Sequence, residues 1–437
     1  MRTLPEYVKN GVMYQLFLRP FTPEGTFKAA EAMLPHLASL GVDIIYLCPF
    51  FAADTDEDVA GWSDRQRGSN LGQPKNPYRI ADYFHVDEEY GTDEDCVNFV
   101  AAAHALGMRV IFDLVYFHCG PTAVFLAEHP DYVMLDEDGK IAVGEWRFPR
   151  LNYENRELRD YLIANMKELI ERFDVDGYRC DVGDGVPLDF WEEAREAIEP
   201  LKADLMMLNE GHKKEALDKA FELNYGYYLR NGILAVAKGE PVSKLSGNLR
   251  DVDEYFGGRA IEFLDNHDTA NNDWYDRLET QLGGEVMELA LVINLTMNAH
   301  PMLYNGVEVA DTNRHSIWGN RFHGANLTID WQNLATAAGQ KRLQLVRKLT
   351  AFRREYADEL GIGEAVDYLD AENDRVFVMR RGSIIVAANF SGEAQSVNTG
   401  VMALDVDPLL TRGASISAGG TISMHLAPHG FAVVRVQ

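Results

Sequence analysis

Several features are scarce in this sequence, and each scarcity excludes a class of protein. The chain of 437 residues has only 4 cysteines, with no CxxC pair and no metal-type spacing, which excludes a disulfide scaffold. No run approaches the roughly 20 apolar residues that a membrane-spanning helix needs. Basic residues are also few, since 41 Lys and Arg against 68 Asp and Glu give a formal net charge of −27. Because so acidic a surface repels phosphate backbones and anionic membranes, we expect neither nucleic acid nor a membrane as a partner.

The N-terminal segment, MRTLPEYVKNGVMYQLFLRPF (1–21), lacks the features of a targeting signal. It has no basic stretch followed by an apolar one, and no small-residue cleavage site. We interpret the cysteines as reduced thiols that mostly fill the core: Cys48, Cys96, Cys119 and Cys180. These observations predict a cytoplasmic protein, unless a signal peptide is removed before residue 1.

Short apolar runs alternate with amphipathic segments over roughly the first 310 residues. Such alternation predicts parallel strands that are joined by right-handed crossovers. Eight runs qualify as strands, and eight such units predict an α/β protein with a (β/α)8 barrel, or TIM barrel. The predicted strands lie within residues 11–21, 43–50, 108–118, 177–182, 204–211, 221–228, 259–268 and 300–310.

Two segments depart from this alternation. Residues 119–152 are rich in Pro, Gly, Asp and Glu, and we expect a short loop excursion there, after the third strand. A helix predicted over residues 340–357 closes the barrel, and beyond it apolar and polar residues alternate with period two. We therefore expect a barrel domain over residues 1–358 and a C-terminal antiparallel β-sandwich domain over residues 359–437.

Charged residues that suit catalysis stand near the ends of four predicted strands. In a (β/α)8 barrel, the loops after these ends build the active site. Period-two alternation in GYRCDV (177–182) puts Arg179 and Asp181 on the inward face and Cys180 on the other. A neighbouring guanidinium favours the ionised carboxylate, so we expect Arg179 to lower the pKa of Asp181, as suits a nucleophile.

The next predicted strand ends at Glu210, after a run rich in Leu and Met. A carboxyl group against apolar neighbours tends to have a raised pKa and to stay protonated near neutrality. One ionised and one protonated carboxyl, about 5 Å apart, form the pair that glycoside hydrolysis with retention requires. The third and seventh strands add Asp113, His118, His267 and Asp268. Each of these alone has a structural explanation, but such groups at four strand ends together indicate a site.

Six segments of the chain resemble, in order, the motifs of the α-amylase superfamily, glycoside hydrolase family 13. This large clan contains retaining α-glucosidases and transglucosidases, and the resemblance covers about residues 10 to 430, including the β-rich C-terminal part. The segments that resemble its four conserved regions are DLVYFH (113–118), GYRCDV (177–182), LNEG (208–211) and FLDNHD (263–268). The stretch that leads into the third strand is matched by NPYRIADYFHVDEEYGTDED (76–95). The motif before the second region is matched by FPRLN (148–152).

The resemblance implies a role for each matching residue. Asp181 matches the catalytic nucleophile, Glu210 the general acid/base, and Asp268 the third carboxylate, which stabilises the transition state. Arg179 matches the arginine that supports the nucleophile. The residues implied to bind the sugar at the cleavage site are His118 and His267, by hydrogen bonds, and Tyr78, by stacking of its ring.

The sequence departs from the family at its calcium site. The family usually has Asn just before the His of the first region, as a ligand of a structural calcium, but here that position is Phe117. Phenylalanine offers no oxygen, and calcium takes about six to eight oxygen ligands. The loop RPFTPEGTF (19–27) also lacks the Asp/Asn cluster of a second calcium site that some members have. We therefore expect no structural calcium, no other metal and no cofactor.

Three features bear on the choice of substrate. FPRLN (148–152) resembles the neopullulanase and cyclomaltodextrinase branch more than typical amylases, although that branch usually has an extra N-terminal β-domain. Residues 182–185 lack the Lys-His pair with which secreted α-amylases hold the chain beyond the cut. Trp62, Trp146 and Trp318, predicted in loops, are candidates for stacking on further sugar units, although plain packing is the commoner role of tryptophan.

The residues and the resemblance together predict a retaining glycosidase that cleaves α-glucosidic bonds of maltooligosaccharides or short α-glucans by double displacement. No motif separates water from a sugar as the acceptor, so a 4-α-glucanotransferase or other transglucosidase of the same superfamily is the alternative. A non-catalytic relative that binds a sugar or a partner protein is a weaker alternative, because all three catalytic carboxylates are present. Linkage preference, chain length and oligomeric state are not predicted.

Overall fold

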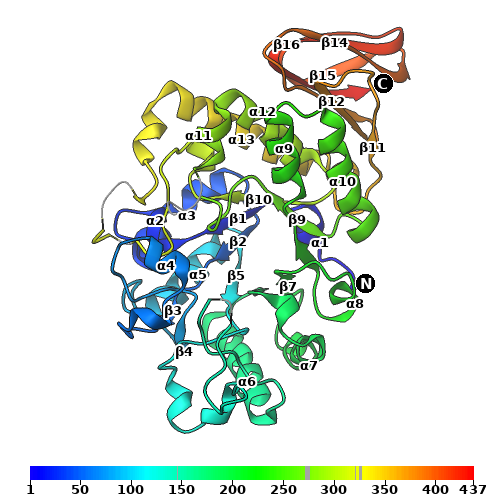
Figure 1. Cartoon of the computed structure of the whole chain (residues 1–437). Coiled ribbons are helices and arrows are strands. Elements are labelled where there is room, and N and C mark those ends of the chain that lie inside the picture. The colour runs from blue at the N-terminus through cyan, green and yellow to red at the C-terminus, as the bar shows by residue number, and fades with distance from the viewer. Residues whose placement is uncertain (145, 271–275, 320, 324–326) are drawn as a thin grey trace.

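The computed structural model of the protein describes all residues except 145, 271–275, 320 and 324–326 (Figure 1). Each predicted run contains one strand of a barrel, and these strands are β1 (Met13–Leu16), β2 (Ile44–Leu47), β5 (Arg109–Leu114), β6 (Gly177–Cys180), β7 (Met206–Asn209), β8 (Leu223–Tyr225), β9 (Ala260–Phe263) and β10 (His300–Tyr304). They form a closed parallel barrel in the order β1-β10-β9-β8-β7-β6-β5-β2, as predicted.

Helices cover the outside of the barrel (Figure 1). The longer ones are α3 (Phe27–Ser39), α5 (Asp93–Ala105), α6 (Arg156–Phe173), α7 (Leu188–Ile198), α9 (Tyr228–Ala237), α10 (Val242–Phe256), α12 (Gly284–Thr296) and α13 (Ala337–Glu355). The short ones are α1 (Glu6–Asn10), α2 (Leu18–Phe21), α4 (Asp64–Gly68), α8 (Ala216–Lys219), α11 (Leu278–Leu282) and α14 (Ala357–Leu360). Across the described ranges, no helix combines the length and the apolar character that crossing a membrane requires.

Local signals in the sequence explain where these helices begin and end. At α6, the side chain of Asn155 caps the first turn by accepting from the N–H of Glu157 and of Leu158. The helix ends at Phe173, because the backbone of the next residue, Asp174, is left-handed and cannot continue it. α13 covers most of the helix predicted over residues 340–357.

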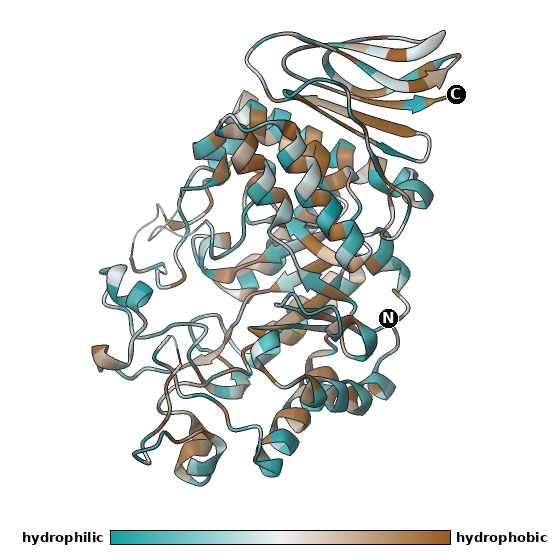
Figure 2. Cartoon of the chain, turned by 45° about the vertical axis from the view of Figure 1, so that its right-hand side comes forward, coloured by the Kyte–Doolittle hydropathy of each residue, from teal (hydrophilic) through white to brown (hydrophobic). Residues whose placement is uncertain are grey.

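Alternation along the strands builds two apolar layers. Ile44 and Tyr46 of β2 point into the barrel, whereas Ile45 and Leu47 pack outward under the helices. Figure 2 shows hydrophobic and hydrophilic colours side by side on the helices, as expected of elements that cover a core with one face. The same alternation turns some polar residues of the strands inward, toward the carboxyl end of the barrel.

The connections after β2 and β5 are long and lie at the carboxyl ends of the strands. The first contains β3 (Phe51–Ala53) and β4 (Ile80–Val86), a small antiparallel sheet that was not predicted. The second contains residues 119–152, which form short 3-10 turns and isolated antiparallel bridges, one of them between His118 and Arg150. Both connections contribute walls to the site described below.

The chain ends in an antiparallel sheet, as predicted. Its strands are β11 (Asp367–Tyr368), β12 (Val376–Arg381), β13 (Ile384–Asn389), β14 (Gln395–Ala403), β15 (Val406–Ser417) and β16 (Gly420–Val436). The sheet lies beside α12 and α10, and an ion pair between Arg412 of β15 and Glu288 of α12 joins the two parts (Figure 1). The sandwich arrangement and the boundary at residue 358 stay predictions.

Candidate active site

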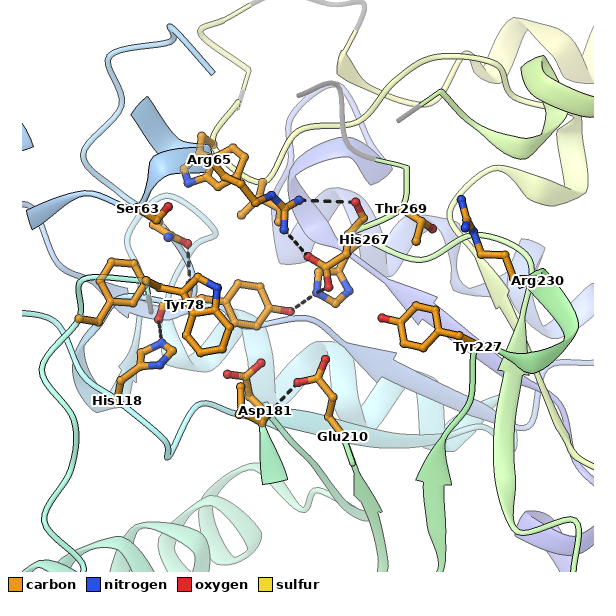
Figure 3. Close-up of a pocket in the computed structure, with 17 residues that line it drawn as sticks. Ser63, Arg65, Tyr78, His118, Asp181, Glu210, Tyr227, Arg230, His267 and Thr269 are labelled. Carbon is orange, nitrogen blue, oxygen red and sulfur yellow. Dashed lines mark hydrogen bonds and ion pairs between the residues drawn. The ribbon is translucent and has the colours of Figure 1, made fainter. Parts of the chain in front are cut away.

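The residues predicted to act on a substrate lie together at the carboxyl ends of the barrel strands. A cavity of about 430 Å³ lies there, between the loops that follow β2, β5, β6, β7, β8, β9 and β10 (Figure 3). Six of the seven predicted residues line the cavity: Tyr78, His118, Asp181, Glu210, His267 and Asp268. The seventh, Arg179, is fully buried on β6.

Arg179 gathers three carboxyl groups at the floor of the cavity. The parallel register of β5 and β6 places Asp113 directly beside Arg179, and Nη1 lies 2.7 Å from Oδ1 of that aspartate. The same Nη1 lies 2.8 Å from Oδ1 of Asp181, and Nη2 lies 2.8 Å from Oε1 of Glu210. Because Asp181 and Glu210 bind the two terminal nitrogens of one guanidinium, their carboxyl groups are neighbours, as in the pair about 5 Å apart of retaining glycosidases.

Burial changes the expected electrostatics of Asp181. Loss of solvent raises the pKa of Asp181 well above its ordinary value, against the opposing effect of Arg179. The carboxyls of Glu210 and Asp113 raise the pKa of Asp181 further. The prediction of a lowered pKa is therefore wrong, because it counted the arginine but neither the desolvation nor the neighbouring acids.

The backbone turn after β6 orients Glu210. Val182, next to Asp181, has a left-handed backbone with φ of 45°, which is uncommon for a β-branched residue. In this turn the N–H of Val182 donates to Oε2 of Glu210 at 2.7 Å. Since Arg179 binds the other oxygen, both oxygens of Glu210 are held, and its side chain keeps 24% exposure toward the cavity.

Tyr78 and His267 form one wall. Their rings are nearly parallel, with 13° between the planes, and the Tyr78 hydroxyl lies 2.7 Å from Nε2 of His267. Oε1 of Gln15 accepts from the backbone N–H of His267, so the amide nitrogen of Gln15 faces Nδ1 and donates to it at 2.7 Å. The ring proton of His267 therefore lies on Nε2, on the cavity side.

His118 is neutral, and one of its ring nitrogens is buried without a partner among the described residues. Its Nε2 donates to the backbone carbonyl of Tyr78 at 2.8 Å, and its Nδ1 has no partner among the described residues. Burial lowers the pKa of His118 to about 4, so the imidazole is uncharged near neutral pH. Phe148 and Trp146 pack beside it, with ring centres 4.9 Å and 5.6 Å away. His118, Phe148 and Trp146 therefore form an uncharged, largely aromatic part of the cavity wall.

Asp268 differs from Asp181 and Glu210 because it has a cation of its own. Nη1 of Arg65 lies 2.9 Å from Oδ1 of Asp268, and Nε2 of His267 lies 3.3 Å from Oδ2. Burial raises the pKa of Asp268, but His267 and Arg65 outweigh burial and lower it to about 2. Asp268 is therefore ionised near neutral pH. Arg65 was not predicted, because it lies on the short helix α4 within a long connection, where no periodic pattern of the sequence marks it.

The cavity also contains residues that were not predicted to line it: Ser63, Asn76, Val182, Tyr227, Arg230, Thr269 and Ile317. Two of the three tryptophans that were candidates for stacking on sugar lie at the cavity, and one does not. Trp146 and Trp318 line the cavity, whereas Trp62 is buried elsewhere and its Nε1 donates to the carbonyl of Asp56 at 3.0 Å. Phe148, which also lines the cavity, belongs to a motif that was recognised, FPRLN, and could have been predicted from it.

Phe117, which the resemblance places at the position of a calcium ligand, packs against a cation. The guanidinium of Arg150 lies 4.8 Å from the centre of the Phe117 ring, and Gly185 leaves the room that this ring needs. Within the part of the chain that the structure describes, no three His, Cys, Asp or Glu side chains converge as metal ligands would. The expected absence of a structural calcium stays a prediction.

Comparisons with known proteins agree with this geometry. The model of the α-amylase catalytic domain matches residues 9–138 and 141–351. A cyclomaltodextrinase from Geobacillus thermopakistaniensis is 26% identical over 99% of this chain and 78% of its own. An intracellular maltogenic amylase from Bacillus subtilis is 24% identical over 86% of this chain and 67% of its own. The chain spans 60% of the length of a further cyclomaltodextrinase, from a Bacillus species.

A solved structure gives the same result for the fold. The crystal structure of a maltogenic α-amylase from Thermotoga neapolitana has a TM-score of 0.81 and 25% sequence identity, with 98% of this chain and 99% of that chain covered. The barrel, the cavity at its carboxyl end and the match of the family model over most of the sequence show that this chain belongs to the α-amylase family of glycoside hydrolases.

Proposed function

We propose that this protein hydrolyses α-glucosidic bonds in maltooligosaccharides and other short α-glucans, with retention at the anomeric carbon. The observation that carries the proposal is the pair Asp181 and Glu210, bound to the two terminal nitrogens of the buried Arg179 and facing one cavity. Retaining glycosidases work with such a pair of neighbouring carboxyls. Relatives named cyclomaltodextrinase and maltogenic amylase support α-glucans as the class of substrate.

The pair performs a double displacement. Asp181 reacts in its ionised form: it attacks the anomeric carbon and forms a glycosyl ester, while Glu210 in its protonated form gives its proton to the leaving oxygen. Glu210, now ionised, then takes a proton from water, whose oxygen displaces Asp181 from the anomeric carbon. In each step one carboxyl gains the charge that the other loses. Because Arg179 contacts both, the net charge beside the guanidinium stays constant.

The other cavity residues act on the sugar that is attacked. Positive charge develops on its ring in the transition state, and the carboxylates of Asp181 and Asp268 stabilise that charge. His118 and His267 line the cavity beside this sugar, as the histidines that bind it in the resembling family do. The ring of Tyr78 offers an apolar face for the sugar.

An aryl α-maltoside tests the reaction directly. We expect the wild type to release the aryl group and, by NMR at early times, to produce the α-anomer of maltose first. Asp181→Asn should abolish the release. First appearance of the β-anomer would contradict retention, and an unimpaired Asp181→Asn variant would contradict the assigned nucleophile.

Maltotriose tests whether water is the acceptor. Glucose and maltose as the only products, separated by chromatography, would support hydrolysis. Products longer than maltotriose would instead show that the protein is a transglucosidase of the same family.

We also propose a cytoplasmic location. The four cysteines are free and buried, as expected for a reducing compartment, and one relative is named as an intracellular amylase. Immunoblots of cytosolic and extracellular fractions from the source cells would check this, and enrichment outside the cells would contradict it.

A further inference from the structure

Arg65 joins three loops at one end of the cavity. It belongs to α4 in the connection after β2, whereas Asp268 follows β9 and Trp318 follows β10. The guanidinium of Arg65 contacts Asp268, with 2.9 Å from Nη1 to Oδ1, and lies 5.4 Å from the centre of the Trp318 ring. Figure 3 shows Arg65 reaching across the cavity from the Ser63 side toward His267 and Thr269.

α4 is anchored, so Arg65 projects from a fixed turn. Oγ of Ser63 caps the helix by accepting from the N–H of Gln66 at 3.1 Å. Gln66 is buried, and its Nε2 donates to the carbonyls of Gln73 at 2.9 Å and Pro74 at 3.1 Å. The side chain of Arg65 keeps only 17% of its exposure. The contact with Asp268 is therefore part of the cavity wall.

The catalytic pair gives the direction of a bound sugar chain. The leaving sugar lies on the side of Glu210, which protonates it, and Tyr227 and Arg230 lie beyond Glu210 on that side (Figure 3). The sugar that is attacked lies over Asp181. Further sugars attached to its nonreducing end would extend away from Glu210, into the part of the cavity that Arg65, Asp268 and Trp318 line.

We propose that Arg65 is a specificity-determining residue that ends the binding site on this side, so that the enzyme removes short units from the nonreducing ends of α-glucan chains. This inference rests on the proposed function. A chain that continues past the wall has to separate Arg65 from Asp268 and from the face of Trp318. The sugar chain offers Arg65 only neutral hydroxyls in place of the ionised Asp268. Separating the two residues is therefore unfavourable in free energy. A chain that ends before the wall leaves these contacts intact.

Three substrates of similar size separate cleavage at chain ends from cleavage within chains. Linear maltoheptaose has a free nonreducing end, 4,6-O-benzylidene maltoheptaose has the same end blocked by a bulky group, and β-cyclodextrin has no end. We expect kcat/KM of the wild type for the free chain to exceed that for the other two by about a hundredfold or more. Chromatography of the first products from the free chain gives the length of the unit removed.

Variants at Arg65 test the cause of this selectivity. Arg65→Ala opens the wall, so kcat/KM for the blocked and cyclic substrates, relative to the free chain, should rise about tenfold or more. Arg65→Lys keeps a cation for Asp268 but loses the planar stack on Trp318, so it should preserve most of the selectivity. Arg67→Ala is the matched control, because Arg67 lies on the same helix, pairs with the exposed Asp64 and does not line the cavity. It should leave the ratio unchanged.

The quantity compared between wild type and variants is the ratio of kcat/KM for the blocked or cyclic substrate to kcat/KM for the free chain. A ratio is needed because loss of Arg65 also alters Asp268 and lowers the absolute rate on every substrate. Wild-type rates for free and blocked chains within about threefold of each other would overturn the inference, and so would an Arg65→Ala variant with an unchanged ratio. Melting temperatures check that the variants are folded, and Arg65→Gln repeats the measurement with a longer side chain. Release from the aryl α-maltoside, and its loss in Asp181→Asn, tests the proposed function separately from this ratio.

Discussion

Two buried arginines, Arg179 and Arg277, form similar ion pairs in different surroundings. Nε of Arg277 lies 3.0 Å from Oδ2 of Asp265, its Nη1 lies 3.0 Å from Oδ2 of Asp311, and its Nη2 donates to the backbone carbonyl of Asn305. Both of these aspartates are almost fully buried and do not line the cavity. Arg179 instead binds three acids, and two of them face the cavity.

The pKa values of the two clusters show what this difference does. Burial raises the pKa of Asp311, but the hydrogen bond from His315 and the charges of His315 and Arg277 outweigh burial and lower it. At Asp181 burial and the neighbouring acids prevail, and the pKa is raised. The acids of the Arg277 cluster are paired inside the fold, whereas the Arg179 cluster has more acids than cations and borders the cavity. The presence of an arginine near an aspartate in the sequence therefore does not tell a structural cluster such as that of Arg277 from one beside a cavity such as that of Arg179.

The largest expected effect comes from breaking the Arg179 cluster at its nucleophile. Asp181→Asn removes the covalent route, so kcat on an aryl α-maltoside should fall by about ten-thousandfold or more. The melting temperature should stay close to that of the wild type, because Asn is of the same size and burial disfavours the charge that it removes. Residual activity within about tenfold of the wild type would contradict the role of Asp181.

Glu210→Gln should have a large effect that depends on the leaving group. Oligosaccharides need protonation of the leaving oxygen, so their kcat/KM should fall by about a hundredfold or more. Activated aryl glycosides need little protonation in the first step and should be slowed far less in the pre-steady-state release of the aryl group. Equal losses on both kinds of substrate would show that Glu210 is not the acid.

The same kind of change in the Arg277 cluster should act on stability. Asp311→Ala removes one of the two buried carboxylates that pair with Arg277 and takes away the acid that pairs with His315, so the free energy of unfolding in urea should fall by about 1–3 kcal/mol. We expect kcat/KM to change by less than about tenfold, since Asp311 does not line the cavity. The surface pair between Asp64 and Arg67 is the control, and Asp64→Ala should leave stability unchanged. A loss of activity without a loss of stability would overturn the comparison.

Features that depend on neighbouring residues in the sequence could be predicted, and features that depend on contacts between distant residues could not. All eight barrel strands could be predicted because apolar alternation is a local property, whereas β3 has three residues and irregular pairing. Asp181 and Glu210 could be placed because both follow strands. The raised pKa of Asp181 could not be predicted, because desolvation and the Asp113 carboxyl depend on the folded barrel. Arg65 was missed since its partner, Asp268, is 203 residues away in the sequence.

A smaller effect should appear in the pH profile of Asp113→Asn. Asp181 must be ionised to attack, so activity is lost as the pH falls through the pKa of Asp181 in the folded protein. The Asp113 carboxyl raises that pKa, so removing its charge should lower the pKa and extend activity to lower pH. The acid limb of kcat/KM against pH measures the shift. A limb that stays in place, or moves to higher pH, would show that Asp113 does not act on Asp181 through its charge.

The smallest expected effect is that of removing divalent cations. Arg179 and Arg277 supply the positive charge in both clusters, and Phe117 stands where the family has a calcium-binding Asn. A ligand that binds only the folded state stabilises it by about 4 kcal/mol at a thousandfold excess over Kd, so stripping a tight calcium would lower the melting temperature by several degrees. We expect EDTA to change neither the melting temperature nor kcat. A drop of several degrees that added calcium restores would show that residues 119–152 build an ion site after all, with backbone carbonyls as ligands in place of the missing Asn.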